Sequence, residues 1–210
     1  MTSRADAKDA TRRRLLEAAG EVIREQGAPA LSLREVARRA GIVPSAVYRH
    51  LASRDELITQ LVLAAYTSLA EHLETTVAAS SPSWRTAADA LREWTLAHVH
   101  EFQLIYGTPV PGYRAPEETI TAAARVAAVF LQVGAVSGAP PDALAEQLRE
   151  PAAQLGTDVT TLARTLADLS QLVGLLTLEL GGHFVGTADP AQGLWDEVVA
   201  RQAAERAPSR

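Results

Sequence analysis

The chain has 210 residues, a formal net charge of −5 at neutral pH and no cysteine. The lack of cysteine excludes disulfides, thiolate nucleophiles and cysteine-ligated zinc. No apolar run approaches the roughly 18 to 20 residues that span a bilayer, and residues 1–14 lack the apolar core of a secretory signal. We therefore expect a cytoplasmic protein that has no membrane partner.

The charge is divided unevenly along the chain. Residues 1–60 contain 11 Lys/Arg and 8 Asp/Glu, a net charge of +3, whereas residues 61–210 contain 9 and 17, a net charge of −8. Much of the basic charge is clustered, at Arg12–Arg14, Arg34, Arg38–Arg39, Arg49 and Arg54. A basic module on an acidic body is typical of a protein that presents one end to phosphate, although solvated helix faces would produce the same counts.

The first 80 residues show the start and stop signals of four helices. Apolar residues at helical spacing predict a first helix that ends at Gly27. Ser32 and Glu35 form a capping-box pattern, in which the Ser32 hydroxyl accepts the Glu35 N–H and the carboxylate reaches back. This pattern predicts a helix over 33–40 that ends at Gly41. Pro44 suits the first turn of a short helix to about Leu51, and a longer helix is predicted over 54–79.

The same signals continue to the end of the chain. They predict further helices at about 84–106, 116–136, 142–155, 158–180 and 190–206, and no segment alternates as a strand does. We predict an all-α protein of about nine helices. Residues 1–58 form an N-terminal three-helix domain with a helix-turn-helix, and residues 59–210 form a helical C-terminal domain.

The helices at 33–40 and 44–51 are joined by a short turn that contains glycine, as in a helix-turn-helix. In that motif the second helix enters the major groove of DNA. Val47 and Leu51 are expected to pack inward, and the outer face is expected to expose Ser45, Ala46, Tyr48, Arg49 and His50. Donors grouped on one short helix suit phosphates and base edges.

The stretch LSLREVARRAGIVPSAVYRHLASRDEL, residues 31–57, resembles the DNA-binding signature of the TetR family. That signature has an initiating Thr or Ser, an Ala-Gly-Val turn, a Leu-Tyr-x-His-Phe segment and a following Lys. Ser32, Ala40–Ile42, Val47–Leu51 and Arg54 occupy these places. The chain departs from the pattern at Val43, where the family commonly has a Ser or Thr that caps the recognition helix, and a lost cap costs about 1 kcal/mol.

The resemblance implies roles for these residues and for the whole chain. Ser32, Tyr48, His50 and Arg54 are expected to hold phosphates, and Arg34, Ser45, Ala46 and Arg49 to lie nearest the base edges. From the residues alone, Tyr48 also suits packing against the first helix, and His50 suits a capping or packing role. The family likeness further implies a ligand-released homodimeric repressor on a palindromic, double-stranded operator, with activation as an open alternative.

A ligand pocket is expected between helices of the C-terminal domain. Trp94, His98, Phe102 and Tyr106 recur every four residues along the predicted helix 84–106, and neighbouring helices add Tyr66 and Phe130. Residues 91–112 show a weaker resemblance to the C-terminal domain of one TetR subgroup. Ordinary core packing of the same side chains is the alternative, and the sequence does not identify the small-molecule effector.

The last two predicted helices are expected to form the dimer surface. Leucines cover more than one face of 158–180, so that one face is left for a partner after the other is buried, unless the helix is fully internal. TetR-like proteins form a four-helix bundle from two such helices of each subunit. The expected interface residues are Leu172, Leu175, Leu176, Glu179, His183, Leu194, Trp195 and Val198.

The sequence offers little for catalysis. His98 and His100 lie about 200° apart around a helix, so they do not share one metal ion, and the i, i+4 histidine spacing of helical zinc sites is absent. No Gly-rich phosphate loop and no Gly-x-Ser-x-Gly motif occurs. We expect no enzyme, no metal and no cofactor. The alternative is a helical small-molecule-binding or enzymatic protein that reuses the fold without binding DNA.

Overall fold

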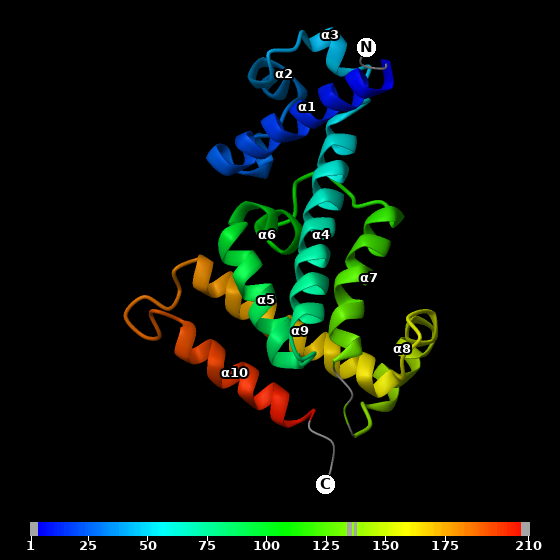
Figure 1. Ribbon diagram of the computed structural model, residues 1–210, viewed down its shortest axis with the longest axis vertical. Coiled ribbons are helices and arrows are strands. Elements are labelled where there is room, and N and C mark those ends of the chain that lie inside the picture. The colour runs from blue at the N-terminus through cyan, green and yellow to red at the C-terminus, as the bar shows by residue number, and fades with distance from the viewer. Residues whose placement is uncertain (1–3, 134–135, 137, 207–210) are drawn as a thin grey trace. The chain divides into compact units, whose positions relative to one another are not determined.

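The computed structural model describes residues 4–133, 136 and 138–206, and this part of the chain contains ten α-helices, one 3-10 helix and no strand (Figure 1). The predicted all-α fold is confirmed. In chain order the elements are α1 (Arg4–Gln26), η1 (Ala28–Ala30), α2 (Leu33–Ala40), α3 (Pro44–Val47), α4 (Arg54–Ala79), α5 (Trp84–Ala97), α6 (Val99–Tyr106), α7 (Glu117–Gln132), α8 (Asp142–Gln154), α9 (Val159–Leu180) and α10 (Gln192–Ala204). None of the described helices combines the length and the apolarity needed to cross a membrane.

The chain forms two compact units. Unit 1 comprises residues 1–65 and 100–119, and unit 2 comprises residues 66–99 and 120–210. The α4 helix is continuous across residues 58 and 59, where the sequence suggested a domain boundary. The 58/59 division stays a prediction, and the two compact units are used below.

The helices of unit 1 pack because each carries an apolar stripe. The α1 helix contacts α2, and α2 contacts α3. Their inward side chains are fully buried, among them Leu15, Val22, Val36, Val47 and Leu51. Burial of each such side chain removes apolar surface from water and contributes about 1.5–3 kcal/mol. This packing fixes the position and orientation of α3 against α1 and α2.

Local signals set both ends of α2 as predicted. The Ser32 hydroxyl accepts a hydrogen bond from the Glu35 N–H at 3.2 Å. At the other end, Gly41 has φ 63°, and its N–H donates to carbonyls of the last turn. One detail of the predicted capping box is wrong: the Glu35 carboxylate accepts hydrogen bonds from Arg38 and Arg39 instead of reaching back to Ser32.

We expect Gly41→Ala to lower the free energy of unfolding by about 1–2 kcal/mol, because a side chain in the left-handed region costs that much. Gly20→Ala is the matched control on α1, where an added Cβ meets only the flexible Arg24 side chain at 3.6 Å. The control should stabilise the protein by up to about 1 kcal/mol, because alanine is the better helix former. Urea unfolding measures both variants, and equal effects of the two substitutions would contradict the turn geometry.

The recognition helix is shorter than predicted. Regular α-helix ends at Val47, and Tyr48–His50 form a turn in place of a continued helix to Leu51. The backbone N–H groups of Arg49, His50 and Leu51 still donate to carbonyls three or four residues earlier. The segment therefore keeps a helical course while its last turn tightens.

A second difference lies at His98. The single helix predicted over 84–106 is two helices, α5 and α6, so the described residues form one more α-helix than predicted. His98 leaves the helical region, with φ −130° and ψ 51°, while its backbone N–H donates to the Trp94 carbonyl at 2.9 Å. Its Nδ1 lies 2.9 Å from the same carbonyl oxygen, and its ring stacks on Trp94. Neither glycine nor proline marks this break in the sequence.

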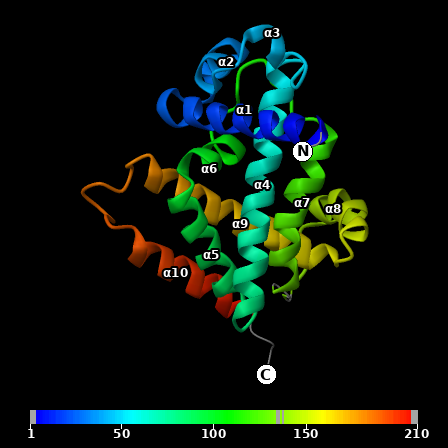
Figure 2. The ribbon, with the colours of Figure 1, turned by 45° about the horizontal axis from the view of Figure 1, so that its top comes forward.

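Unit 2 is built around α5, α9 and α10, which contact one another (Figure 2), with α8 packed against α9. Trp84 and Trp195 are buried, and both indole N–H groups have acceptors: the Gln202 side chain at 2.9 Å and the Asp89 carboxylate at 2.8 Å. The buried Arg92 forms a two-pronged ion pair with Glu179 and lies over the Trp195 ring. Satisfied polar groups of this kind fix which side of α10 faces the core.

Candidate nucleic-acid interface

The α3 segment, residues 43–51, comprises α3 and the residues on either side of it. Its outer side carries polar, aromatic and basic side chains. Val47 and Leu51 are fully buried, as predicted. Ser45, Tyr48 and Arg49 are exposed, with Tyr48 60% exposed, and Ala46 is half-buried. The exposure of Tyr48 means that its ring does not serve as a core aromatic, which was one of its two expected roles. A hydroxyl, a phenol and a guanidinium are thus presented to solvent from one short segment.

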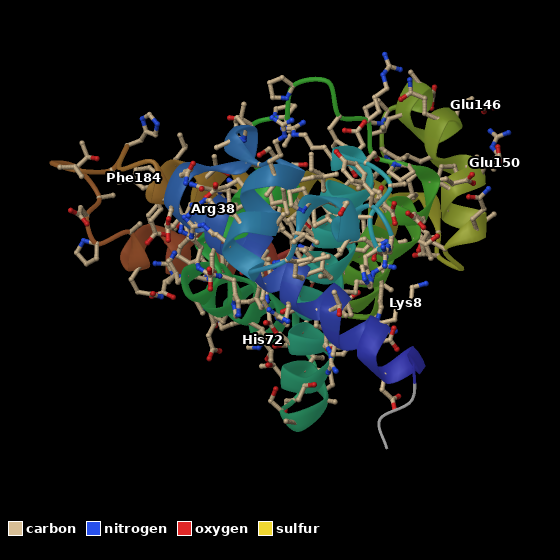
Figure 3. The ribbon with its side chains drawn as sticks, turned by 90° about the horizontal axis from the view of Figure 1, so that it is seen from above. Lys8, Arg38, His72, Glu146, Glu150 and Phe184 are labelled. Atoms are coloured by element: carbon tan, nitrogen blue, oxygen red, sulfur yellow. The ribbon has the colours of Figure 1, made fainter. Side chains whose placement is uncertain are left out.

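Several arginines near this surface are held by acidic partners within unit 1. Arg38 on α2 (Figure 3) donates to both carboxylate oxygens of Glu35, at 2.9 and 2.5 Å. Arg39 forms a two-pronged pair with Glu25 and also reaches Glu35. These contacts brace α2 against α1, because Glu25 lies on α1. Most of the charge of Arg38 and Arg39 is therefore already matched inside the protein.

The hydrogen bond from Arg38 is the main cause that lowers the pKa of Glu35 from 4.5 to about 2. We expect Arg38→Ala to raise this pKa towards 4.5. Because the folded-state pKa is depressed, the ionised carboxylate stabilises the fold above pH about 4.5, and that contribution is lost as the pH falls through about 2. NMR titration of the Glu35 carboxyl measures this, with Arg34→Ala as the control that leaves the pKa unchanged. A carboxyl that titrates near 4.5 in the unmodified protein would contradict the pairing.

Within the helix-turn-helix, two arginines remain available for an outside partner. Among the residues that the structure describes, Arg34 and Arg49 have no hydrogen-bond acceptor and no acidic partner for their side chains, and both are exposed. Arg34 lies in the first turn of α2 and Arg49 follows α3, so both belong to the helix-turn-helix. Exposed guanidinium groups without internal partners suit bidentate contacts to phosphate or to guanine.

Of the other three predicted phosphate contacts, the Arg54 and Ser32 side chains make internal hydrogen bonds as well, and the His50 side chain makes none with the described residues. The Arg54 Nε donates to the Leu31 carbonyl at 2.8 Å, which ties the start of α4 to the segment before α2. The Ser32 hydroxyl is engaged as the cap of α2 but is exposed. His50 is half-buried, and its Nδ1 is enclosed without a hydrogen-bond partner. The bracing role of Arg54 was missed in the sequence, since no local pattern links residues 23 positions apart.

The predicted pocket residues do not form one stripe. Trp94 and Phe130 are buried in unit 2, where Tyr66 and His98 are half-buried, and in unit 1 Phe102 is buried and Tyr106 half-buried. The break at His98 removes the continuous helix on which the predicted stripe depended. The Trp94 indole donates to the Ser68 hydroxyl at 3.0 Å. Trp94, Phe102 and Phe130 are buried as core residues, which is the alternative that the sequence left open.

Two cavities in the described part of unit 2 have a size that holds a small molecule. One, of about 510 Å³, lies between α8 and α9, and its lining includes Leu144, Ala163 and Arg164. The other, of about 500 Å³, lies between α4 and α7, with an apolar floor at Val77 and Val129 beside the Glu74–Arg125 ion pair. Ligand pockets commonly have volumes of about 300–1,000 Å³. None of the six predicted pocket residues lines either cavity.

Most of the predicted dimer residues are in the core of unit 2. Five are buried inside the subunit: Leu172, Leu175, Leu176, Trp195 and Val198. Glu179 is half-buried on Arg92, Leu194 is half-buried, and His183 is exposed. The five buried side chains offer little surface to a partner in this conformation, and their interface role stays a prediction. The outward apolar residues of α9 are instead Leu166 and Leu178, each 44% exposed.

The described residues contain no group of three or more His, Asp or Glu side chains that is arranged to hold a metal ion. His72 is the histidine with an acidic neighbour, Glu93, at 3.8 Å.

The fold and the site define a protein class: a helix-turn-helix module at the N-terminus, joined to a helical C-terminal body. Residues 15–61 match the family model for bacterial regulatory proteins of the tetR family, and residues 84–202 match the model for the tetracyclin repressor-like C-terminal domain. The chain belongs to the TetR family of bacterial regulatory proteins.

Known relatives agree with this membership. The chain is 39% identical over 145 residues to the HTH-type transcriptional regulators Rv1816 of Mycobacterium tuberculosis and Mb1846 of Mycobacterium bovis; the match covers 66% of this chain and 62% of each relative. It is similar to the crystal structure of the regulatory protein SCO4313, with a TM-score of 0.85 and 35% identity over 97% of this chain and all of the other. The regulator FadR of Bacillus subtilis, at 12% identity and a TM-score of 0.60, shares the fold over 92% of this chain and 98% of the other.

Proposed function

We propose that this chain is a transcriptional regulator that binds double-stranded DNA through α2, the Gly41 turn and α3. The observation that carries the proposal is the pair Arg34 and Arg49, exposed and without internal partners in the described structure, on a helix-turn-helix whose neighbouring arginines are paired. Phosphate contacts position such a module on the duplex, and contacts to base edges give it sequence specificity. Arg49 and Ser45 act at base edges, and Tyr48 holds phosphate.

We further propose that two copies bind a palindromic operator. A twofold dimer presents two equivalent recognition helices, and half-sites one DNA turn apart match that symmetry. The outward side of α9, with Leu166 and Leu178, and the half-buried Leu194 of α10 supply the apolar surface for such a dimer. Apolar side chains left exposed near one another on a surface are typical of an interface.

Release by a small molecule completes the proposal. The cavities of unit 2 supply the space, and the FadR structure of Bacillus subtilis was determined as a complex with stearoyl-CoA. A ligand shifts the protein away from its DNA-binding state only by as much as it binds the other state better. The α4 helix has residues in both compact units, so it is one covalent path for that coupling.

Selection of bound duplexes from a random pool tests the proposal, followed by a screen for small molecules that release the selected duplex. We expect one enriched sequence with two inverted half-sites. Tyr48→Ala should weaken binding to selected and random duplexes alike, because it removes a hydrogen bond to phosphate that carries no sequence information. A pool without enrichment would favour the alternative, a helical small-molecule-binding or enzymatic protein that does not bind DNA.

A further inference from the structure

The start of the α3 segment is apolar where DNA donors would be expected. Val43, which precedes Pro44 at the start of α3, is 66% exposed and makes no capping hydrogen bond. In the described part of unit 1, the large hydrophobic residues that are exposed are Val43 and Tyr48, and both lie on this one segment. Exposed apolar side chains that gather at one place on a surface usually mark a contact with a partner.

Val43 has an apolar neighbour one turn along. The Ala46 N–H donates to the Val43 carbonyl at 2.9 Å, which closes the first turn of α3. The half-buried Ala46 thereby lies one turn from the isopropyl group of Val43. Neither side chain has a hydrogen-bond donor, so neither is able to hold a phosphate. Their contribution to binding is limited to apolar contact.

The charge around Val43 and Ala46 indicates which kind of partner this surface binds. Arg49 follows it on the same segment, and Arg34 lies on α2, both without an acidic partner in the described structure. Exposed guanidinium groups favour a polyanion over an uncharged protein surface. In the major groove the base edges display hydrogen-bonding groups and one apolar group, the C5-methyl of thymine. The first residues of a recognition helix are those that meet base edges.

We propose that Val43, together with Ala46, reads the C5-methyl group of a thymine in each operator half-site. This inference rests on the proposed function and adds a base preference to it. Val43 is thus a specificity-determining residue, while Arg49 and Tyr48 supply charge and hydrogen bonds. The proposal predicts at least one thymine per half-site whose methyl group is required for full affinity.

The test uses the duplex selected above, in which each thymine in turn is replaced by deoxyuridine. This substitution removes the methyl group and leaves the hydrogen-bonding edge unchanged. At one position in each half-site we expect the affinity of the full chain to fall about fourfold, which corresponds to one methyl group at ~0.8 kcal/mol. Val43→Ser should bind the thymine and uracil duplexes equally at that position, and Val43→Thr should keep part of the difference because it keeps one methyl group.

Ile120→Ala is the matched control, because Ile120 is 67% exposed on α7, outside the helix-turn-helix. This variant should keep the full fourfold difference. Tolerance of uracil at every position, or a thymine preference that persists in Val43→Ser, would overturn the inference. Either result leaves DNA binding intact, whereas a selection without enrichment removes the proposed function and this inference together.

Discussion

Arg49→Ala is expected to weaken binding to the selected duplex by roughly 5- to 150-fold, because a good arginine contact to a base edge contributes about 1–3 kcal/mol of discrimination. Arg49 is exposed and has no partner among the described residues, so its removal should leave the melting temperature unchanged. Fluorescence anisotropy at fixed salt measures the dissociation constant for the selected duplex and for a scrambled one. The loss should be greater for the selected duplex.

The control for this prediction is Arg149→Ala. Arg149 pairs with Glu146 on the surface of α8, beside Glu150, where the side chains project from the helix (Figure 3). Arg149→Ala removes the same charge from the chain but should change binding less than twofold, because Arg149 lies on α8, outside the helix-turn-helix. If Arg49→Ala and Arg149→Ala weaken binding to the selected duplex equally, the net charge of the chain determines the affinity and the position of Arg49 does not.

Trp195→Ala is expected to lower the free energy of unfolding by about 3–5 kcal/mol, the usual cost of removing a buried tryptophan. The side chain is fully buried, its indole donates to Asp89 at 2.8 Å, and its ring lies 5.3 Å from the Arg92 guanidinium. Truncation therefore opens a cavity and leaves polar groups without partners. Urea unfolding followed by circular dichroism measures the change.

Leu96→Ala is the control, since Leu96 is 46% exposed on α5. We expect this variant to unfold with a much smaller loss of stability. Were Trp195 an interface residue, as the sequence suggested, its removal would change the dependence of stability on protein concentration and spare the folded subunit. A concentration-dependent loss of that kind would contradict the core position.

The helix-turn-helix could be predicted because its signals are local. The Ser32 cap, the left-handed Gly41 and the proline at the start of α3 each act within one turn of helix. The helical spacing of apolar and polar residues then indicated that Val47 packs inward and Arg49 faces out, as the structure shows. Short-range hydrogen bonds and steric limits are encoded in a few adjacent residues, so one sequence is sufficient to recognise them.

The sequence was least informative where packing over long distances decides the outcome. A helix that is apolar on two sides does not reveal which side meets its own subunit, and the structure buries Leu172 and Leu176 inside unit 2. The helix break at His98 depends on the imidazole and the Trp94 carbonyl, with no glycine or proline to mark it. Arg54 bonds to Leu31 across 23 residues, a pairing that no periodicity indicates. These features follow from tertiary contacts that are absent from the local pattern.

Sequence-specific binding of DNA is the central claim, and a specificity ratio tests it most directly. The measurement compares dissociation constants of the full chain for the selected duplex and for a scrambled duplex of the same composition, at one salt concentration. A regulator of this class should bind the selected duplex at least about 10³-fold more tightly. Equal dissociation constants for the two duplexes would contradict the claim that this helix-turn-helix reads a DNA sequence.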